Sequence, residues 1–138
     1  MLLISMGGEA YALPSSSVRE VIRYREFTPV PGAPPILPGI LSQRGLILPI
    51  VNAYPLLGLA APPVSRATRL VIIAHRDVDL ALLVEAVHDL AAIDLDTIEP
   101  LPVALDPARA RFLRGLVHTG EQLIPLLDLD ELIASVRA

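Results

Sequence analysis

The 138-residue sequence has no cysteine, no tryptophan and no long apolar run. Without cysteine there is no disulfide framework, no thiolate zinc site and no cysteine nucleophile, which fits a reducing compartment. The longest apolar stretches, such as Leu80 to Val84, are about five residues long, whereas a membrane-spanning helix needs roughly 20. The start also lacks the charged and apolar regions of a signal peptide. We therefore expect a soluble, cytoplasmic protein with no direct membrane insertion.

Lysine is absent as well, so all 11 basic residues are arginine, and they are scattered among 15 acidic residues for a net charge of −4. The aromatic residues are only three tyrosines and two phenylalanines. Nucleic-acid binding needs clustered cations to neutralise phosphates and aromatic rings to stack on bases. The composition therefore excludes nucleic acid as an expected partner.

Hydrophobic residues make up 53% of the chain, and there are 14 prolines. So many prolines are incompatible with a helical bundle and indicate many short segments separated by turns. These segments are rich in Val, Ile and Leu, which favours strands. Four hairpins are predicted: 2–6 with 9–13, 39–42 with 46–51, 69–75 with 78–84, and 112–117 with 122–127.

Two further strands are predicted over 18–24 and 86–93, although the spacing of Val18, Val21 and Ile22 is also compatible with a helix. Residues 28–38 form a proline-rich connector. Single helical turns are predicted over 53–57, capped by Asn52, and over 107–111, and a short helix over 128–136 has capping-box spacing at its start.

The two halves of the chain repeat one pattern. Ala12-Leu13 and Val18 match Ala81-Leu82 and Val87 at an offset of 69, and later segments match at an offset of 76, as for Gly39 and Gly115. We infer two related half-barrels, approximately residues 1–64 and 65–138, with strand exchange between them possible. About 65 residues bury too little surface for an independent fold, so the halves should share an apolar seam.

No catalytic, cofactor or metal site is predicted. His75, His88 and His118 lack a second histidine at metal-ligand spacing, and no serine lies in a nucleophile elbow. The acids Asp128, Asp130 and Glu131 are expected to cap the C-terminal helix.

Two alternatives belong to other classes of protein. A small β-barrel hydrolase would use His75 or His118 with an acid, and a deep polar pocket joining a histidine to a carboxylate and a serine would favour it. A homo-oligomeric structural protein is the other alternative.

The most specific stretch runs from Pro29 to Leu59. A proline-rich approach leads to the strand Gly39-Ile40-Leu41, the turn Arg44-Gly45, the strand Leu48 to Val51, the cap Asn52 and then Leu57-Gly58-Leu59. This order resembles the CheW family pattern, and the resemblance extends over nearly the whole chain.

The resemblance implies an all-β fold of two linked five-stranded SH3-like barrels with a short C-terminal helix, and no enzymatic activity. It also implies two partners: the regulatory domain of a CheA-type histidine kinase and the signalling tip of a methyl-accepting chemoreceptor. An adaptor of a non-chemotaxis motility or other kinase pathway is an alternative that the sequence does not separate.

Four residues match positions that the family uses for protein binding: Val18, Glu20, Gly39 and Arg44. A guanidinium at a hairpin tip presents a planar fork of donors that suits a carboxylate. The sequence departs from the family pattern at Ser42-Gln43, Asn52, Ala81 and Glu85, which bears on the choice of partner.

Overall fold

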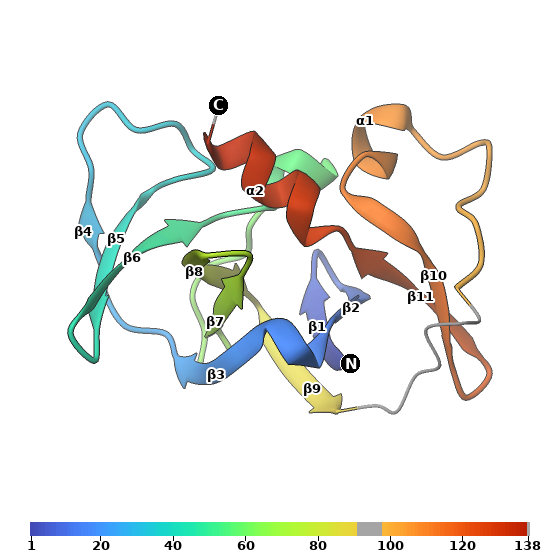
Figure 1. Cartoon of the computed structure of the whole chain (residues 1–138), viewed down its shortest axis with the longest axis horizontal. Coiled ribbons are helices and arrows are strands. Elements are labelled where there is room, and N and C mark those ends of the chain that lie inside the picture. The colour runs from blue at the N-terminus through green and yellow to red at the C-terminus, as the bar shows by residue number, and fades with distance from the viewer. Residues whose placement is uncertain (91–97, 138) are drawn as a thin grey trace.

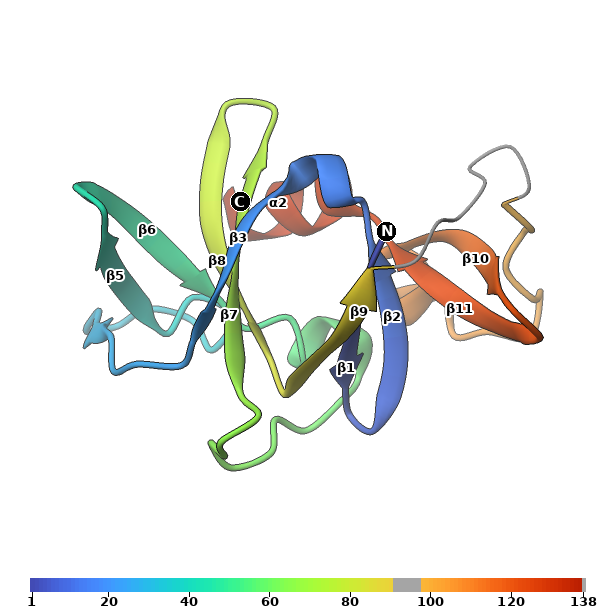
Figure 2. The same ribbon diagram turned by 90° about the horizontal axis from the view of Figure 1, so that it is seen from below.

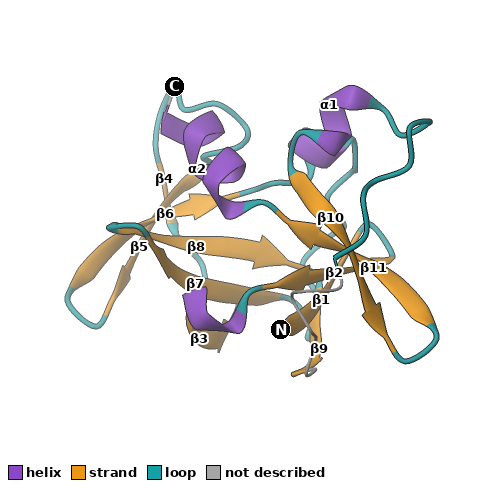
Figure 3. Ribbon diagram, turned by 45° about the vertical axis from the view of Figure 1, so that its right-hand side comes forward, coloured by secondary structure: helices purple, strands orange, loops and turns teal. Residues whose placement is uncertain are grey.

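The computed structural model describes residues 1–90 and 98–137. The described residues form two β-sheets with a few short helical elements (Figures 1 and 3). The strands are β1 Leu2–Met6, β2 Glu9–Leu13, β3 Val18–Arg23, β4 Thr28–Pro29, β5 Gly39–Gln43, β6 Leu46–Val51, β7 Arg69–His75, β8 Val78–Val84, β9 Ala86–Leu90, β10 Leu113–Thr119 and β11 Gln122–Leu127. The helical elements are η1 Ser15–Ser17, η2 Pro55–Leu57, α1 Pro107–Ala110 and α2 Leu129–Arg137.

Sheet A has the strand order β10-β11-β2-β1-β9, and sheet B has the order β3-β7-β8-β6-β5-β4. Each sheet contains one parallel pair, β11 with β2 in sheet A and β6 with β8 in sheet B. All other pairs are antiparallel. The β5–β6 and β10–β11 hairpins lie at opposite ends of the long axis of the molecule (Figure 1).

The two sheets exchange hairpins reciprocally. The first hairpin of the chain, β1–β2, lies in sheet A between β9 and β11, and the corresponding hairpin of the second half, β7–β8, lies in sheet B between β3 and β6. Residues 1–64 and 65–138 therefore each supply strands to both sheets. The exchange that the sequence left possible is observed, and a cut at residue 64 does not separate the sheets.

The apolar seam expected between the halves is present as one core cluster with members from both sheets. Ile4 of sheet A and Val71 of sheet B belong to it, and both are fully buried. Helix α2 lies over the joint and adds Leu129, Leu132 and Ile133 (Figures 1 and 2). Two smaller clusters fill sheet B and sheet A separately. Because the largest core spans the joint, neither sheet has a complete core of its own.

The predicted all-β class with a short C-terminal helix is confirmed. All four predicted hairpins are observed, residues 18–23 form a strand rather than a helix, and the strand predicted over 86–93 is observed to Leu90, beyond which residues 91–97 lie outside the described part. The helical turn η2 ends at Gly58, whose φ of 69° suits glycine. In residues 1–90 and 98–137 no helix is long and apolar enough to cross a membrane.

Candidate docking site

The tip of the β5–β6 hairpin is a two-residue turn made by Arg44 and Gly45. Their φ angles are 50° and 80°, as a primed hairpin turn requires, and glycine adopts such an angle without steric cost. The turn leaves the Arg44 side chain 77% exposed. The sequence predicted this exposed guanidinium, and the structure confirms its placement.

Glu20 on β3 receives this guanidinium. Arg44 Nε lies 3.3 Å from the Glu20 carboxylate, and Gln43 Nε2 donates to Glu20 Oε1 at 2.7 Å. Arg25 in turn donates to Gln43 Oε1 at 2.6 Å and to the carbonyl of Ser42. We call these four residues (Glu20, Arg25, Gln43 and Arg44) the β3–β5 network.

The β3–β5 network shows how sheet B curves. In the strand order, β3 and β5 are separated by β7, β8 and β6, yet their side chains hydrogen-bond. Sheet B therefore bends until its first strand approaches its fifth, as a barrel requires. The hydrogen bond from Gln43, followed by that from Arg44, lowers the pKa of the Glu20 carboxyl. Glu20 therefore stays ionised and continues to hold the guanidinium of Arg44.

The other two predicted residues have structural surroundings. Val18 begins β3 and is partly buried against the shared core. Gly39 is buried at the start of β5, where a Cβ atom would lie 2.3 Å from the Thr28 carbonyl oxygen and 2.5 Å from the Phe27 ring. Gly39 thus lets β4 approach β5 closely. It takes no part in the β3–β5 network.

Sequence reasoning missed two members of the network. Gln43 stood out only as a departure from the family pattern, although its side-chain amide is what joins Glu20 to Arg25. Arg25 carried no signal in the sequence. It lies in the connector between β3 and β4, and the antiparallel pairing of β4 with β5 brings this connector beside Gln43. The Glu20–Gln43 contact, by contrast, joins strands that are not neighbours in sheet B, and such a contact has no fixed sequence spacing.

Two of the remaining departures, Glu85 and Asn52, also make hydrogen bonds. Glu85 accepts hydrogen bonds from the backbone N–H groups of Gly7 (2.6 Å) and Gly8 (3.1 Å), so it fixes the β1–β2 turn. Tyr54 donates to the same carboxylate at 3.2 Å, and burial raises the pKa of its hydroxyl. Asn52 Oδ1 accepts from the Tyr54 N–H at 3.1 Å. The predicted cap is wrong, because the helical turn begins at Pro55, with Tyr54 as its N-cap and no capping hydrogen bond from a side chain.

A serine, a histidine and an aspartate do come together elsewhere. His75 Nδ1 lies 3.2 Å from Ser17 Oγ, and His75 Nε2 lies 2.9 Å from Asp130 Oδ1. These three residues come from η1, β7 and α2. The composition matches a hydrolytic triad, so its exposure and access must decide its role.

The exposures of the serine and the carboxylate are the reverse of those in a catalytic triad. A triad needs a nucleophile that substrate can reach and a carboxylate that holds the histidine in place. Here Ser17 is only 8% exposed, whereas Asp130 is 55% exposed and shared with Arg76 at 2.8 Å. The hollow beside His75, about 170 Å³, is lined by Asp130 but not by Ser17. The cluster therefore fastens α2 to β7 and η1.

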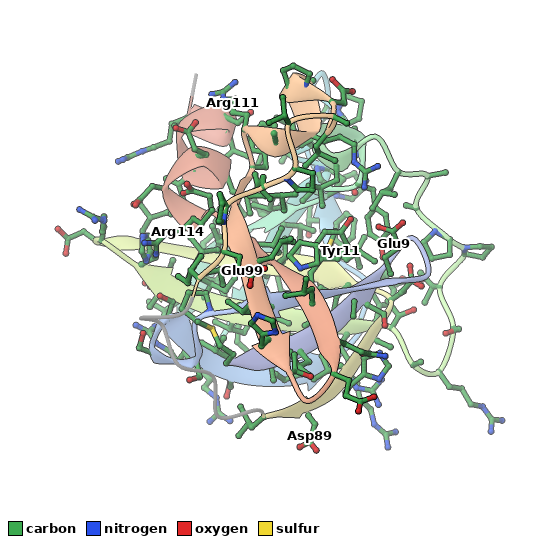
Figure 4. All side chains as sticks on the ribbon, turned by 90° about the vertical axis from the view of Figure 1, so that its right-hand side faces the viewer. Glu9, Tyr11, Asp89, Glu99, Arg111 and Arg114 are labelled. Carbon is green, nitrogen blue, oxygen red and sulfur yellow. The ribbon has the colours of Figure 1, made fainter. Side chains whose placement is uncertain are left out.

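The other acids of the C-terminal helix behave partly as expected. Asp128 accepts the N–H of Glu131 at 3.1 Å and caps the helix, as predicted. Asp130 and Glu131 lie in the first turn of α2, where the macrodipole favours acids, as predicted. Their carboxylates bind side chains: Asp130 binds His75 and Arg76, and Glu131 binds Arg111 at 3.0 Å. Figure 4 shows Arg111 beside α2.

The two remaining histidines are also in simple pairs. His118 Nε2 lies 3.0 Å from Glu99 Oε1, and both side chains are about half exposed. His88 hydrogen-bonds Ser5. Across the described ranges, 1–90 and 98–137, no group of three or more His, Asp or Glu side chains could hold a metal ion.

The fold and its polar clusters define a class of protein: two β domains joined by a common core, with an exposed charged network on a hairpin and polar clusters that fasten elements together. The CheW-like domain model matches residues 1–137, so the chain belongs to the CheW-like family. Members of this family are adaptors, and the chain is a non-enzymatic scaffold.

Individual proteins agree with this membership. The chain is 30% identical to the chemotaxis protein CheW of Rhizobium meliloti, covering 98% of this chain and 87% of that protein. It is 31% identical to protein PilI of Pseudomonas aeruginosa, covering 82% of this chain and 64% of that protein. The crystal structure of the scaffolding protein TtCheW from Thermoanaerobacter tengcongensis matches with a TM-score of 0.83 at 28% identity, covering 93% of this chain and 87% of that one.

Proposed function

We propose that this protein is a cytoplasmic chemotaxis adaptor that couples methyl-accepting chemoreceptors to a CheA-type histidine kinase. The observation that carries the proposal is the β3–β5 network, in which Arg44 is exposed yet held by an ionised Glu20. The guanidinium of Arg44 is held in one geometry, so little conformational entropy is lost when a partner carboxylate binds it. Val18, Glu20, Gly39 and Arg44 remain the proposed docking residues, with Gly39 acting through the shape of β5.

Exposed apolar side chains adjoin this network. Leu46 and Ile47 follow the Arg44-Gly45 turn on β6, and Ile47 is 66% exposed. Val21 is also exposed on β3, but its side chain is on the opposite face of the strand from Glu20. An apolar surface next to a few fixed charges is typical of regulated protein–protein interfaces.

The hairpin at the opposite end of the molecule also exposes an apolar side chain. Leu123 of the β10–β11 hairpin occupies the position of Ile47 at the repeat offset of 76, and it too is exposed. Two similar hairpins at opposite ends allow two partners to bind without competing (Figure 3). Adaptor action then needs no chemistry, because holding receptor and kinase together lets one bias the conformational equilibrium of the other.

The test is a titration with the regulatory domain of the kinase and a receptor signalling-tip fragment from the same organism, first singly and then together. Binding of each, and a complex containing all three proteins, supports the proposal. Binding of neither partner overturns it.

A second candidate is an adaptor that serves a pathway other than chemotaxis. The observation that favours it is the similarity to PilI, a relative whose name does not refer to chemotaxis. Deleting the gene distinguishes the two: loss of swimming towards attractants supports the first, and loss of another motility with normal chemotaxis supports the second.

A further inference from the structure

An open hollow of about 420 Å³ lies at the end of β3 and the beginning of β7, on sheet B. It is at the opposite end of the β7–β8 hairpin from the α2 contact, near the connector that precedes β7 (Figure 2). Its lining consists of Arg23, Tyr24, Val64, Ser65, Arg66, Thr68 and Arg69. Three of these seven residues are arginines, and none is acidic.

The arginines are brought together by the fold. Arg23 and Arg69 are direct register partners on the antiparallel strands β3 and β7. Like charges directly opposite each other destabilise a sheet. Among residues 1–90 and 98–137, the guanidinium groups of Arg23 and Arg66 have no hydrogen-bond or ion-pair partner, so nothing in the described chain offsets this repulsion.

Hydrogen bonds tie together the base of the hollow. Arg69 Nη1 donates to the carbonyls of Arg66 (2.6 Å) and Thr68 (3.0 Å), which leaves its other donors free. The adjoining turn is closed by the Ser65 N–H bonding to Thr68 Oγ1 at 2.8 Å. The backbone of Tyr24 bonds to the Thr68 carbonyl at 3.2 Å and ties the turn to β3.

We propose that this hollow binds a phosphate-bearing small molecule. Three guanidinium groups offer more forked donors than one carboxylate accepts, whereas a phosphate or diphosphate presents three or more oxygens and two or more negative charges. The volume exceeds that of a single phosphate, and Tyr24 and Val64 line the remaining space, which suits an attached organic group. The site is separate from the β3–β5 network and does not depend on the adaptor role.

The test is a calorimetric and NMR titration of the whole chain at low salt with inorganic phosphate, pyrophosphate and AMP. We expect pyrophosphate or AMP to bind, to shift the amide signals of Tyr24, Ser65 and Thr68, and to raise the unfolding temperature. Tighter binding of AMP than of phosphate identifies an organic phosphate as the ligand. Tighter binding of pyrophosphate than of AMP identifies a diphosphate group.

Arg66→Ala and Arg23→Ala should each weaken binding about tenfold, which corresponds to the loss of one charge-assisted hydrogen-bonding group. Arg114→Ala is the matched control, because Arg114 is an exposed arginine on β10 of sheet A and does not line the hollow (Figure 4). No binding at millimolar pyrophosphate and AMP overturns the proposal. Equal weakening by Arg114→Ala, or binding of an acidic peptide in place of all three phosphate compounds, overturns it as well.

Discussion

Ile50 on β6 is the parallel register partner of Ala81 on β8, although the two residues belong to different halves of the chain. The repeat-equivalent residues, Leu126 and Ala12, form the parallel pair of sheet A. The same correspondence holds for the edge strands β3 of sheet B and β9 of sheet A. Val18 on β3 pairs with Ile73, and the equivalent Val87 on β9 pairs with Ile4. The two halves are therefore equivalent in sequence and in the partner strands that each receives from the other half.

This exchange predicts how fragments behave. Residues 1–64 alone should give an insoluble or molten product, because β3 and β6 lack the β7–β8 hairpin that lies between them. Residues 65–138 alone should also fail to fold, because β9 and β11 lack the β1–β2 hairpin that lies between them. Thermal unfolding followed by circular dichroism measures both.

Mixed together, the two fragments should form a one-to-one complex with a cooperative transition, since every exchanged pair joins one fragment to the other. The cut lies in the exposed connector of residues 61–67, so it removes no core contact. A cooperative transition from 1–64 alone would contradict the shared core.

Gly39→Ala should destabilise the protein by about 2–3 kcal/mol, the upper part of the usual cost of overpacking. The added Cβ meets the backbone oxygen of Thr28, which cannot move aside as a side chain could. Gly115→Ala should behave alike, because its Cβ would lie 2.6 Å from the Glu99 carbonyl oxygen. Chemical denaturation measures both.

Gly32→Ala is the control, because a Cβ at this position meets nothing within 4 Å. Only the positive φ of 77° makes alanine unfavourable there. Its cost should be about 1 kcal/mol. A cost for Gly39→Ala no greater than this would show that β4 does not hold its position against β5.

Gln43→Leu should raise the pKa of Glu20 towards the ordinary value for glutamate. The hydrogen bond from Gln43 is the largest cause of the lowered pKa, and leucine cannot donate one. An NMR titration of the Glu20 carboxyl carbon measures the change. Gln122→Leu, on the other exposed hairpin, should leave this titration as it is in the wild type, and an equal shift in both variants would refute the assignment.

The His75–Asp130 contact predicts a pH dependence of stability. The hydrogen bond from His75, followed by the charge of Arg76, lowers the pKa of the Asp130 carboxyl. The unfolded chain therefore binds the proton more readily, so this contribution is complete above the ordinary aspartate value of about 3.9 and is lost as pH falls through the lowered pKa.

Asp130→Asn should reduce the slope of the free energy of unfolding against pH in that acidic window. Asp89→Asn serves as the control, because Asp89 points away from the body of the protein (Figure 4). If both variants keep the wild-type slope, the cluster does not fasten α2.

The sequence predicted local elements well because hairpin turns and helix caps are determined by residues close together in the sequence. The pattern around Arg44-Gly45 specified a turn, and Asp128 specified a helix start. The repeat predicted two equivalent halves, but the choice between keeping and exchanging a hairpin depends on core packing between residues such as Ile4 and Val71, which no local pattern records.

The site was less predictable for the same reason. Glu20 and Arg44 were found through a resemblance, whereas Arg25 reaches Gln43 because the connector after β3 leads into β4, which pairs with β5. His75 and Asp130 were each considered alone, since β7 and α2 are 55 residues apart at their contact.

The central claim is that the exposed network on the β5–β6 hairpin docks partner proteins. The most direct test is sedimentation of the chain with the kinase regulatory domain and the receptor fragment, comparing wild type with Arg44→Glu and with Arg76→Gln, a second arginine at a hairpin turn. The wild type and Arg76→Gln should form the complex of three proteins. Arg44→Glu should remain folded but bind at least one partner tenfold or more weakly, because a carboxylate then faces a carboxylate. Unchanged affinity of Arg44→Glu for both partners would contradict the account.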